Sequence, residues 1–474
     1  MGGCRCEDSP SVPFPCRDMD YDVAGMDNEG GTRLGSKLLI CMIGLSGCGK
    51  TFVAHRIRKF LTWKGYNAKY ISSAEMRVKN FPQYASPPPE FFDDSIPEYE
   101  SIRRRCIDLA FEEIIAFLEG NGQIAIFDGS NLTKSRRDQI NGLIKDHPLI
   151  NPPIWIEMRV KSDEIMMKRF DKHKQQSLEY LGYDMEKAKR EHFKRITFQR
   201  AHYDRIEEED AIYCIVEIGD ADNKRYLVNN VRGYLPTTII SFVMNLHPEA
   251  RPIFFSRHGQ SVYNLEDRIG GDSSLTEYGL QYARKLGQRI AELEELPASR
   301  LVVWTSCLKR TQETAQFIRC RHRVRWQALN EIAGGMCEDL TYKEMEERFP
   351  ELAELRRRDK LGFRYPQGES YIDIIDRLQP VVFELERCTQ PIIVVSHQAV
   401  LRCLLAYFLD IPREKIPFFQ IPFHTLIRIE PRDCSYDEER MPLHPLDVYD
   451  EIPKKMEEME QLHILNKWRK KISK

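Results

Sequence analysis

Two short motifs in this chain supply residue types that handle phosphate. Residues 44–51 read G-L-S-G-C-G-K-T, the spacing of a phosphate-binding loop with its terminal Lys-Thr. Residues 257–261 read R-H-G-Q-S, which places a histidine beside an arginine. The first pattern is typical of binding a nucleotide's phosphates, whereas the histidine of the second could accept a phosphoryl group. One chain therefore combines two motifs of opposite purpose.

The first motif predicts a nucleotide site. Its glycines allow backbone N–H groups to surround phosphate oxygens, and the following helix presents its positive N-terminus to the same anion. Lys50 can reach the β- and γ-phosphates, and Thr51 can hold Mg²⁺. We therefore expect ATP to be bound by the loop residues, which are Gly44, Leu45, Ser46, Gly47, Cys48, Gly49, Lys50 and Thr51.

An acid and several cations complete this predicted site. Asp128 ends the apolar segment I-A-I-F-D, where phosphate-loop enzymes place an acid that contacts Mg²⁺ directly or through water. It could instead accept the proton of an attacking hydroxyl, or only cap a helix. Because Asp128 ends a strand and Thr51 ends the loop, we expect these two residues to bind Mg²⁺. Phosphoryl transfer also needs positive groups, and the residues alone do not choose among Arg103, Arg104, Lys174 and Arg195.

The second motif predicts a covalent route. A neutral His258 can attack phosphorus and form a phosphohistidine that water later hydrolyses. Arg257, Arg310 and His397 are suited to hold the phosphoryl oxygens. Glu331 is the candidate acid for the leaving alcohol. No cluster of metal ligands accompanies these residues in the sequence, so we expect this site to work without a metal.

Hydrophobic patterns place both motifs next to strands. Residues 37–44 are an apolar run that ends at the loop, and residues 51–64 have helical spacing. Alternating strands and helices predict an α/β fold with parallel sheets and sites at the carboxyl ends of strands. Further strands are expected at 123–127, 212–218, 253–256, 301–305 and 391–396, with helical segments around 100–119 and 161–209.

The chain's 474 residues predict several domains. We place a flexible leader at 1–36, a first domain at 37–248, a second at 251–430 and a charged tail at 431–474. The leader begins M-G-G-C-R-C, and Cys6 stands where a myristoylation signal has Ser or Thr, so a plain tail is favoured over a lipid anchor.

Bulk properties exclude some classes of protein. A net charge of −2 gives no reason to expect nucleic-acid binding. No apolar run approaches the roughly 18 residues of a membrane span. The thirteen scattered cysteines beside an ATP-type motif are expected to be mostly reduced thiols, as in a cytoplasmic protein.

Over about residues 37–430, these motifs resemble the bifunctional 6-phosphofructo-2-kinase/fructose-2,6-bisphosphatase family. In the first half the resemblance rests on the loop, F-D-G-S-N at 127–131 and F-K-R-I at 193–196. It is closest in the second half, in R-I-G-G-D-S at 268–273, V-W-T-S at 303–306, K-R-T at 309–311, A-L-N-E-I at 328–332, R-Y-P-Q-G-E-S-Y at 364–371 and S-H-Q-A-V-L-R-C-L-L-A-Y-F-L-D at 396–410.

The resemblance implies a P-loop kinase-type domain followed by a histidine-phosphatase domain like that of phosphoglycerate mutases. It implies synthesis of fructose 2,6-bisphosphate from ATP and fructose 6-phosphate, its hydrolysis through a phosphohistidine, control of glycolysis, and a homodimer. It places Lys174 near the phosphates and Arg77, Arg103 and Arg195 near fructose 6-phosphate. Its implied contacts to the sugar bisphosphate are Asn264, Gly270, Tyr342, Arg356, Lys360, Tyr371, Gln398 and Arg402.

Some positions depart from the family's pattern. Gln260 stands where relatives commonly have Glu, Gln199 stands where tyrosine is common, and residues 159–173 show little likeness to the adenine side. Two other hypotheses stay open. One is the same fold with a working phosphatase and a silent kinase, in which His258→Ala would make no product. The other is a non-catalytic nucleotide-binding scaffold, which would bind nucleotide without turnover.

Overall fold

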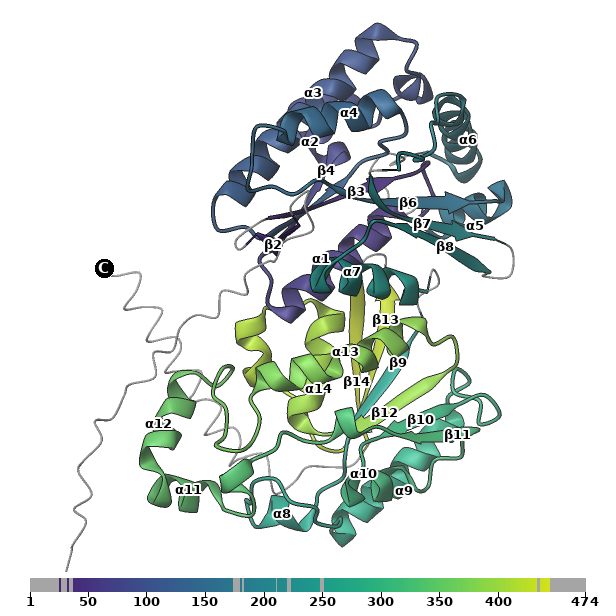
Figure 1. Ribbon diagram of the computed structural model, residues 1–474. Helices are drawn as coiled ribbons and strands as arrows, with labels where there is room; N and C mark the ends of the chain where they lie inside the picture. Colours follow the sequence, from purple (N-terminus) through teal and green to yellow (C-terminus); the bar gives the residue numbers. More distant parts are fainter. Residues whose placement is uncertain are drawn as a thin grey trace, which may run out of the picture.

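The computed structural model describes residues 25–26, 32–33, 37–173, 180, 183–209, 211–219, 223–247, 251–432 and 435–443. Figure 1 shows two α/β domains, and within those residues each has a six-stranded sheet. Of the expected leader, only the short strands β1 (Gly25–Met26) and β2 (Thr32–Arg33) are described. Gly2, Cys6 and residues 444–474 of the expected tail lie outside the described residues.

The sheet of the first domain has the order β4-β5-β3-β6-β7-β8. Its run L-L-I-C-M-I in β3 is buried at every position, as expected for a strand covered on both faces. The strands run parallel except β8, which is antiparallel to β7. The six strands are β3 (Leu38–Ile43), β4 (Ala68–Ser72), β5 (Ile124–Asp128), β6 (Ile154–Val160), β7 (Ile212–Ile218) and β8 (Lys224–Asn229).

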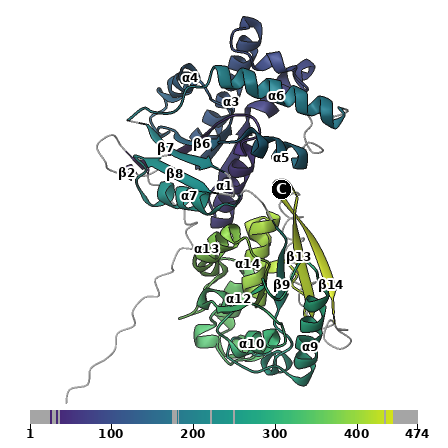
Figure 2. The ribbon, with the colours of Figure 1, turned by 90° about the vertical axis from the view of Figure 1, so that its right-hand side faces the viewer.

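Helices cover both faces of this sheet (Figures 1 and 2). Ile40 and Met42 of β3 share a core with α1 and α7, whereas Leu39 and Cys41 pack with α3 and α4. The predicted helical stretch 161–209 contains two separate helices, α5 and α6. The helices are α1 (Lys50–Lys64), α2 (Ser73–Asn80), α3 (Pro97–Glu119), α4 (Lys134–Ile144), α5 (Asp163–His173), α6 (Met185–Ala201) and α7 (Tyr234–Asn245).

The sheet of the second domain has the order β11-β10-β12-β9-β13-β14. Its first four strands run parallel, but β13 is antiparallel to both β9 and β14. The predicted parallel strands are present in both sheets, and each sheet also contains one strand that runs in the opposite direction, β8 in the first and β13 in the second. The second sheet continues past residue 430, to Pro442. The strands are β9 (Ile253–Arg257), β10 (Val302–Thr305), β11 (His322–Arg325), β12 (Ile392–Ser396), β13 (Thr425–Arg432) and β14 (Ser435–Pro442).

Seven α-helices of the described residues belong to this second domain: α8 (Val262–Leu265), α9 (Glu277–Glu292), α10 (Lys309–Ala315), α11 (Tyr342–Arg348), α12 (Pro350–Arg358), α13 (Tyr371–Arg387) and α14 (Gln398–Leu409). Short 3₁₀ helices are η1 (Pro82–Tyr84) and η2 (Pro89–Phe92) in the first domain, and η6 (Gln327–Leu329), η7 (Gly335–Cys337) and η8 (Arg413–Phe418) in the second.

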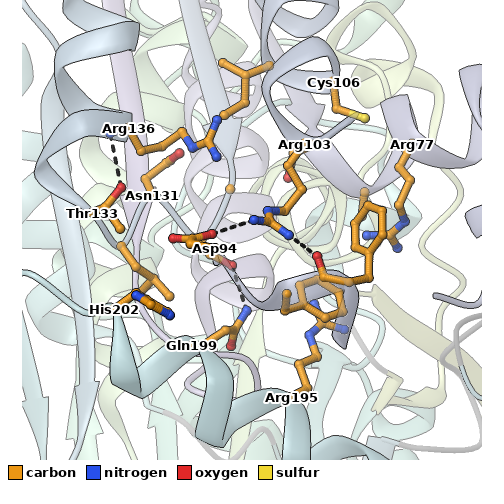
Figure 3. A pocket seen from close by; sticks show the side chains of 18 residues that line it. Arg77, Asp94, Arg103, Cys106, Asn131, Thr133, Arg136, Arg195, Gln199 and His202 are labelled. Atoms are coloured by element: carbon orange, nitrogen blue, oxygen red, sulfur yellow. Dashed lines mark hydrogen bonds and ion pairs between the residues drawn. The ribbon is translucent and has the colours of Figure 1, made fainter. Parts of the chain in front are cut away.

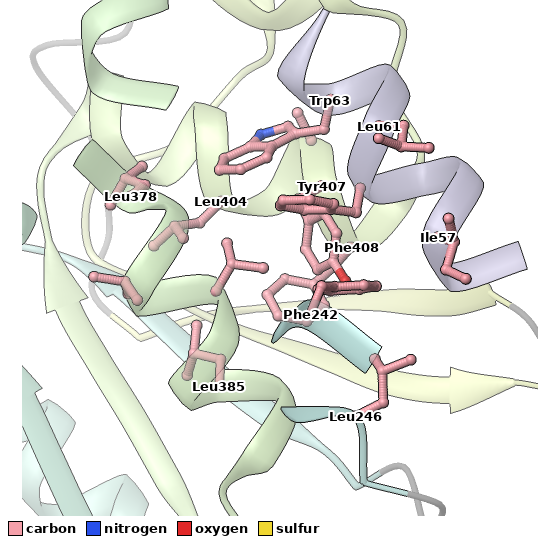
Figure 4. Packing of buried hydrophobic residues seen from close by; sticks show 14 of the residues in the cluster. Ile57, Leu61, Trp63, Phe242, Leu246, Leu378, Leu385, Leu404, Tyr407 and Phe408 are labelled. Carbon is pink, nitrogen blue, oxygen red and sulfur yellow. The ribbon is translucent and has the colours of Figure 1, made fainter. Parts of the chain in front are cut away.

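One continuous apolar core joins the two domains (Figure 4). The rings of Phe60 on α1 and Phe242 on α7 stack 4.5 Å apart, and the indole N–H of Trp63 donates to the carbonyl oxygen of Cys403 on α14 at 2.9 Å. Arg56 and Glu386 form a buried ion pair across this interface at 2.9 Å. Helices α1 and α14 each begin at a predicted site and pack against the other domain, so the two sites share one rigid support.

Candidate active sites

The predicted phosphate-binding loop lies between β3 and α1. Gly44, Gly47 and Gly49 have φ angles of 143°, 81° and 97°, a backbone region that side chains rarely adopt. A Cβ on Gly44 would also lie 2.5 Å from the Met158 carbonyl oxygen. The ammonium group of Lys50 donates to the carbonyl oxygen of Leu45 at 2.7 Å. The glycines thus give the loop its curvature, and the lysine lies against it.

Two side chains from outside the loop contact it. The backbone N–H of Ser46 donates to the side-chain oxygen of Gln199 at 2.9 Å. Arg169 on α5 donates to the carbonyl oxygen of Cys48 at 3.2 Å. Sequence reasoning missed Arg169, which lies in the segment with little family likeness. Lys174, which was predicted to approach the phosphates, lies outside the described residues.

Asp128 and Thr51 lie together beside the loop. The Thr51 hydroxyl donates to Asp128 Oδ2 at 2.6 Å, and the Tyr70 hydroxyl donates to the same oxygen at 2.9 Å. A hydroxyl and a carboxylate are hard oxygen ligands of the kind that Mg²⁺ takes together with nucleotide phosphates. Among the described residues no group of three or more His, Cys, Asp or Glu forms a metal site. The pair therefore suits an ion that obtains its other ligands from ATP and water.

A pocket of about 120 Å³ adjoins the loop (Figure 3). Its lining includes four arginines from different elements: Arg77 on α2, Arg103 on α3, Arg136 on α4 and Arg195 on α6. Gln199 lines the pocket and also contacts the loop through Ser46. An anionic sugar bound among these arginines would therefore lie next to the nucleotide phosphates.

The arginines of this pocket already have partners within the protein. Arg103 donates to Asp94 at 2.6 Å and to Glu100 at 2.9 Å, and Arg136 donates to both oxygens of Glu100 at 2.9 and 2.7 Å. Arg195 lies 3.7 Å from the centre of the Phe92 ring. Arg104, the fourth cation considered from sequence, is exposed and does not line the pocket.

Arg136 was missed from the sequence. It lies in the first turn of α4, just after the F-D-G-S-N motif, and burial lowers its pKa. Its position after that motif was the available signal. Local sequence does not indicate which of the many arginines become buried.

In the second domain, His258 follows β9 and is 3% exposed. Its Nδ1 lies 2.7 Å from the carbonyl oxygen of Gly259. Because a carbonyl oxygen only accepts, Nδ1 carries the proton and Nε2 of the neutral ring holds the free lone pair. Burial, together with the charges of Arg310 and Arg257, lowers the pKa of His258 well below its usual value. The ring is therefore neutral, and Nε2 is the nitrogen that could act as a nucleophile.

His397, at the start of α14, lies beside His258 with ring centres 5.1 Å apart. Arg310 Nε donates to its Nδ1 at 3.2 Å, and its Nε2 lies 2.8 Å from the Ser306 hydroxyl. Since a guanidinium only donates, the neutral ring carries its proton on Nε2. Burial, with the charge of Arg310, lowers the pKa of His397 well below its usual value.

The remaining charged groups lie around the same two histidines. Burial lowers the pKa of Arg257 to about 9, with Glu331 opposing the shift and Arg402 and Arg310 adding to it. Arg257 lies 3.5 Å from the centre of the Phe423 ring. One oxygen of Glu331 accepts from the backbone N–H of Ala399 at 3.3 Å. The structure thus brings together His258, Glu331, His397, Arg257 and Arg310.

The predicted sugar contacts fall into three groups. Tyr371 and Arg402 are joined by a 3.0 Å hydrogen bond, with Gln398 one turn before Arg402 on α14. Arg356 lies 5.2 Å from the Tyr342 ring, and Lys360 lies 5.2 Å from the Phe418 ring. The third group contains Asn264 and Gly270. The side-chain oxygen of Asn264 accepts from the backbone N–H of Ser261 at 2.9 Å. Gly270 has a φ of 69°, and a Cβ added there would lie 1.8 Å from a Glu338 carboxylate oxygen, so a side chain does not fit.

Comparison with known proteins agrees with two domains of different chemistry. The family model described as "6-phosphofructo-2-kinase" matches residues 28–250. The one described as "Histidine phosphatase superfamily (branch 1)" matches residues 253–442. None of the described helices is long and apolar enough to cross a membrane.

Among three of the similar proteins, two carry both activities in their names and one carries the phosphatase activity alone. A 6-phosphofructo-2-kinase/fructose-2,6-bisphosphatase of Aquarana catesbeiana is 37% identical over 84% of this chain and 83% of that protein. A relative from Saccharomyces cerevisiae named "Fructose-2,6-bisphosphatase" is 34% identical over 87% of this chain and 89% of its own length. For a 37% identical Arabidopsis thaliana relative, the match covers 86% of this chain but 54% of that protein. The chain belongs to the 6-phosphofructo-2-kinase/fructose-2,6-bisphosphatase family, with an ATP-using kinase domain followed by a histidine-phosphatase domain.

Proposed function

We propose that the chain both makes and hydrolyses fructose 2,6-bisphosphate, at two separate sites. The observation that carries this proposal is the pairing of a phosphate loop next to a pocket with four arginines and a buried neutral histidine among cations. The first arrangement suits transfer of a phosphoryl group to a sugar phosphate. The second suits its removal. Opposing activities in one chain would regulate glycolysis, and the cytoplasmic location and homodimer implied by the resemblance stay predictions.

In the kinase domain, the loop amides and Lys50 would bind the ATP phosphates, and Lys50 would exchange the Leu45 carbonyl for a phosphate oxygen. Thr51 and Asp128 would hold Mg²⁺, which would supply positive charge to offset that of the phosphates during transfer. Arg77, Arg103, Arg136 and Arg195 would bind the 6-phosphate and direct the 2-hydroxyl toward the γ-phosphate. Lys174 would add a further cation near the phosphates.

In the phosphatase domain, His258 Nε2 would attack the phosphorus of the 2-phosphate, forming an N–P bond while the bond to the sugar oxygen breaks. Glu331 would protonate that oxygen and then take a proton from the water that hydrolyses the phosphohistidine. Arg257, Arg310 and His397 would hold the transferring oxygens. Asn264, Gly270, Tyr342, Arg356, Lys360, Tyr371, Gln398 and Arg402 would bind the rest of the sugar bisphosphate.

A trapping experiment tests the phosphatase role. Enzyme mixed with fructose 2,6-bisphosphate labelled in its 2-phosphate and quenched rapidly should carry acid-labile label on His258. His258→Ala should carry none, and Glu331→Gln should accumulate label more slowly than wild type. Label on another residue, or hydrolysis without any labelled protein, would contradict the proposal.

A second candidate is a phosphatase with a silent kinase. It is favoured by the Gln199 oxygen that occupies the Ser46 N–H, one of the loop amides expected to bind phosphate. The Saccharomyces cerevisiae relative, which is named only for the bisphosphatase, also supports a silent kinase. Kinase activity in the purified protein, lost in Lys50→Ala, would exclude this candidate.

A further inference from the structure

We propose that His424 is a positioning residue of the phosphatase, holding the peptide that fixes which nitrogen of His258 attacks. The inference rests on the proposed role of His258. His424 is not adjacent to the R-H-G motif in sequence, but it lies directly before β13, which pairs with β9. This strand pairing places His424 next to the backbone that follows His258.

One peptide group links the two histidines. The carbonyl oxygen of Gly259 accepts from His258 Nδ1 at 2.7 Å. The N–H of the same peptide belongs to Gln260 and donates to His424 Nε2 at 3.2 Å. Because both groups belong to one planar unit, fixing its N–H also fixes its carbonyl oxygen. His424 therefore determines the direction of the carbonyl that holds the proton on His258 Nδ1.

The protonation state of His424 follows from this geometry. A backbone N–H only donates, so His424 Nε2 must carry the lone pair and the neutral ring carries its proton on Nδ1. Hydrogen bonds in such a chain polarise one another, so the two bonds of this peptide strengthen together. His258 Nε2 is then the atom left unprotonated.

The surroundings of His424 keep its ring in place. The residue is 1% exposed and has φ 52°, a left-handed conformation that histidine adopts more readily than bulkier or branched residues. Its ring stacks on Tyr282 at 4.7 Å and lies against Tyr278 at 5.0 Å, both on α9. Tyr282 in turn contacts the Ser256 hydroxyl at 2.7 Å, one residue before Arg257.

Two substitutions separate hydrogen bonding from packing. His424→Phe keeps a ring beside the two tyrosines but removes the acceptor for the Gln260 N–H. His424→Gln removes the ring but returns an acceptor oxygen at a similar distance along the side chain. Tyr278→Leu is the matched control, since it disturbs the packing of His424 and leaves its acceptor in place.

For His424→Phe we expect kcat of the phosphatase to fall about 10- to 100-fold, the loss typical of one buried hydrogen bond. Its KM should change less than about threefold, because the arginines that bind the substrate are untouched. The rate of phosphohistidine formation in a single turnover should fall with kcat. His424→Gln should recover most of the loss, and Tyr278→Leu should stay near wild type. Kinase activity of the same chains checks that they are folded.

The reverse pattern, in which His424→Phe is active while His424→Gln and Tyr278→Leu are impaired, would show a packing role and overturn the proposal. If His424→Phe does not fold, ¹⁵N-histidine spectra of the wild-type chain can test the proposal instead, because they report which ring nitrogen of His424 is protonated. An unprotonated Nε2 on His424 supports the proposal, and a protonated one overturns it. Failure of wild type to form phospho-His258 would instead refute the proposed function.

Discussion

The two active sites hold their cations in different ways. In the kinase pocket, Arg103 and Arg136 form ion pairs with Glu100 at 2.9 and 2.7 Å. In the phosphatase site, neither Arg257 nor Arg310 has a carboxylate within 4.0 Å among the described residues. Arg257 and Arg310 thus have no carboxylate in direct contact, although Glu331 acts on both electrostatically, whereas Arg103 and Arg136 must exchange a carboxylate for a ligand.

This difference explains how two histidines can stay neutral among arginines. Burial and the positive charge of the arginines both disfavour imidazolium, so both histidines stay neutral and His258 keeps its lone pair on Nε2. The same charge attracts the phosphoryl group of the substrate. Paired arginines would create a weaker field, which suits a kinase pocket that must bind a sugar phosphate and release a bisphosphate.

The domain interface provides the strongest test of what pairing does for a buried arginine. Arg56 is fully buried and lies 2.9 Å from Glu386, which also accepts from the Tyr407 hydroxyl at 2.7 Å. Arg56→Ala leaves Glu386 charged and buried, so we expect a loss of about 3–5 kcal/mol in the free energy of unfolding. Urea unfolding measures this loss.

Arg56→Met with Glu386→Gln in the same chain is the control for that measurement, since it removes both charges. It should recover most of the stability. A single Arg56→Ala variant as stable as wild type would show that the pair contributes nothing to the interface.

Arg310→Ala should have a large effect on rate, because it removes a cation that we propose holds phosphate and that also sets the tautomer of His397. We expect kcat/KM of the phosphatase to fall about 10²- to 10³-fold. The pKa of His258 should also rise toward its usual value, since Arg310 is among the causes that lower it. The pH dependence of kcat/KM reports both changes. An unchanged acid limb would contradict the electrostatic account.

Arg136→Ala should have a smaller effect, because its charge is already offset by Glu100. We expect KM for fructose 6-phosphate to rise about tenfold with little change in kcat, as for loss of one charge-assisted hydrogen bond to a ligand. Initial-rate kinetics of the kinase measure it, with Arg104→Ala as the exposed control on α3. Equal effects of the two substitutions would show that Arg136 does not contact the sugar phosphate.

The smallest expected effect is on stability in mild acid. His258 and His397 have pKa values below that of an unfolded histidine, so the unfolded chain binds more protons as the pH falls through about 6.5. The free energy of unfolding should therefore decrease from pH 7.5 to pH 5.5. The double variant His258→Gln with His397→Gln should show a shallower decrease. A decrease as steep as that of wild type would mean that other groups cause it.

Much of this structure could be predicted from patterns along the chain. Runs such as L-L-I-C-M-I in β3 and I-I-V-V-S in β12 indicated buried strands, and both are buried at every position. The glycine spacing at 44–49 required positive φ angles, and the structure has them. These features are local, since each depends on residues that are neighbours in sequence.

What could not be predicted depends on residues that are distant in sequence. Strand β14 is rich in charged residues, so it was included in the tail predicted at 431–474. Nothing near Arg136 indicated that Glu100 would lie beside it, and Arg104 had the same local character as Arg103. His424 gave no signal, because its contact with the Gln260 N–H exists only after β13 pairs with β9.

The central claim is that one chain holds two working sites with opposite effects. Its most direct test measures fructose 2,6-bisphosphate made from ATP, Mg²⁺ and fructose 6-phosphate by wild type, Lys50→Ala and His258→Ala. We expect His258→Ala to accumulate more product than wild type and Lys50→Ala to make none. No product from any of the three, while wild type still hydrolyses added fructose 2,6-bisphosphate, would contradict the claim and leave a phosphatase with a silent kinase domain.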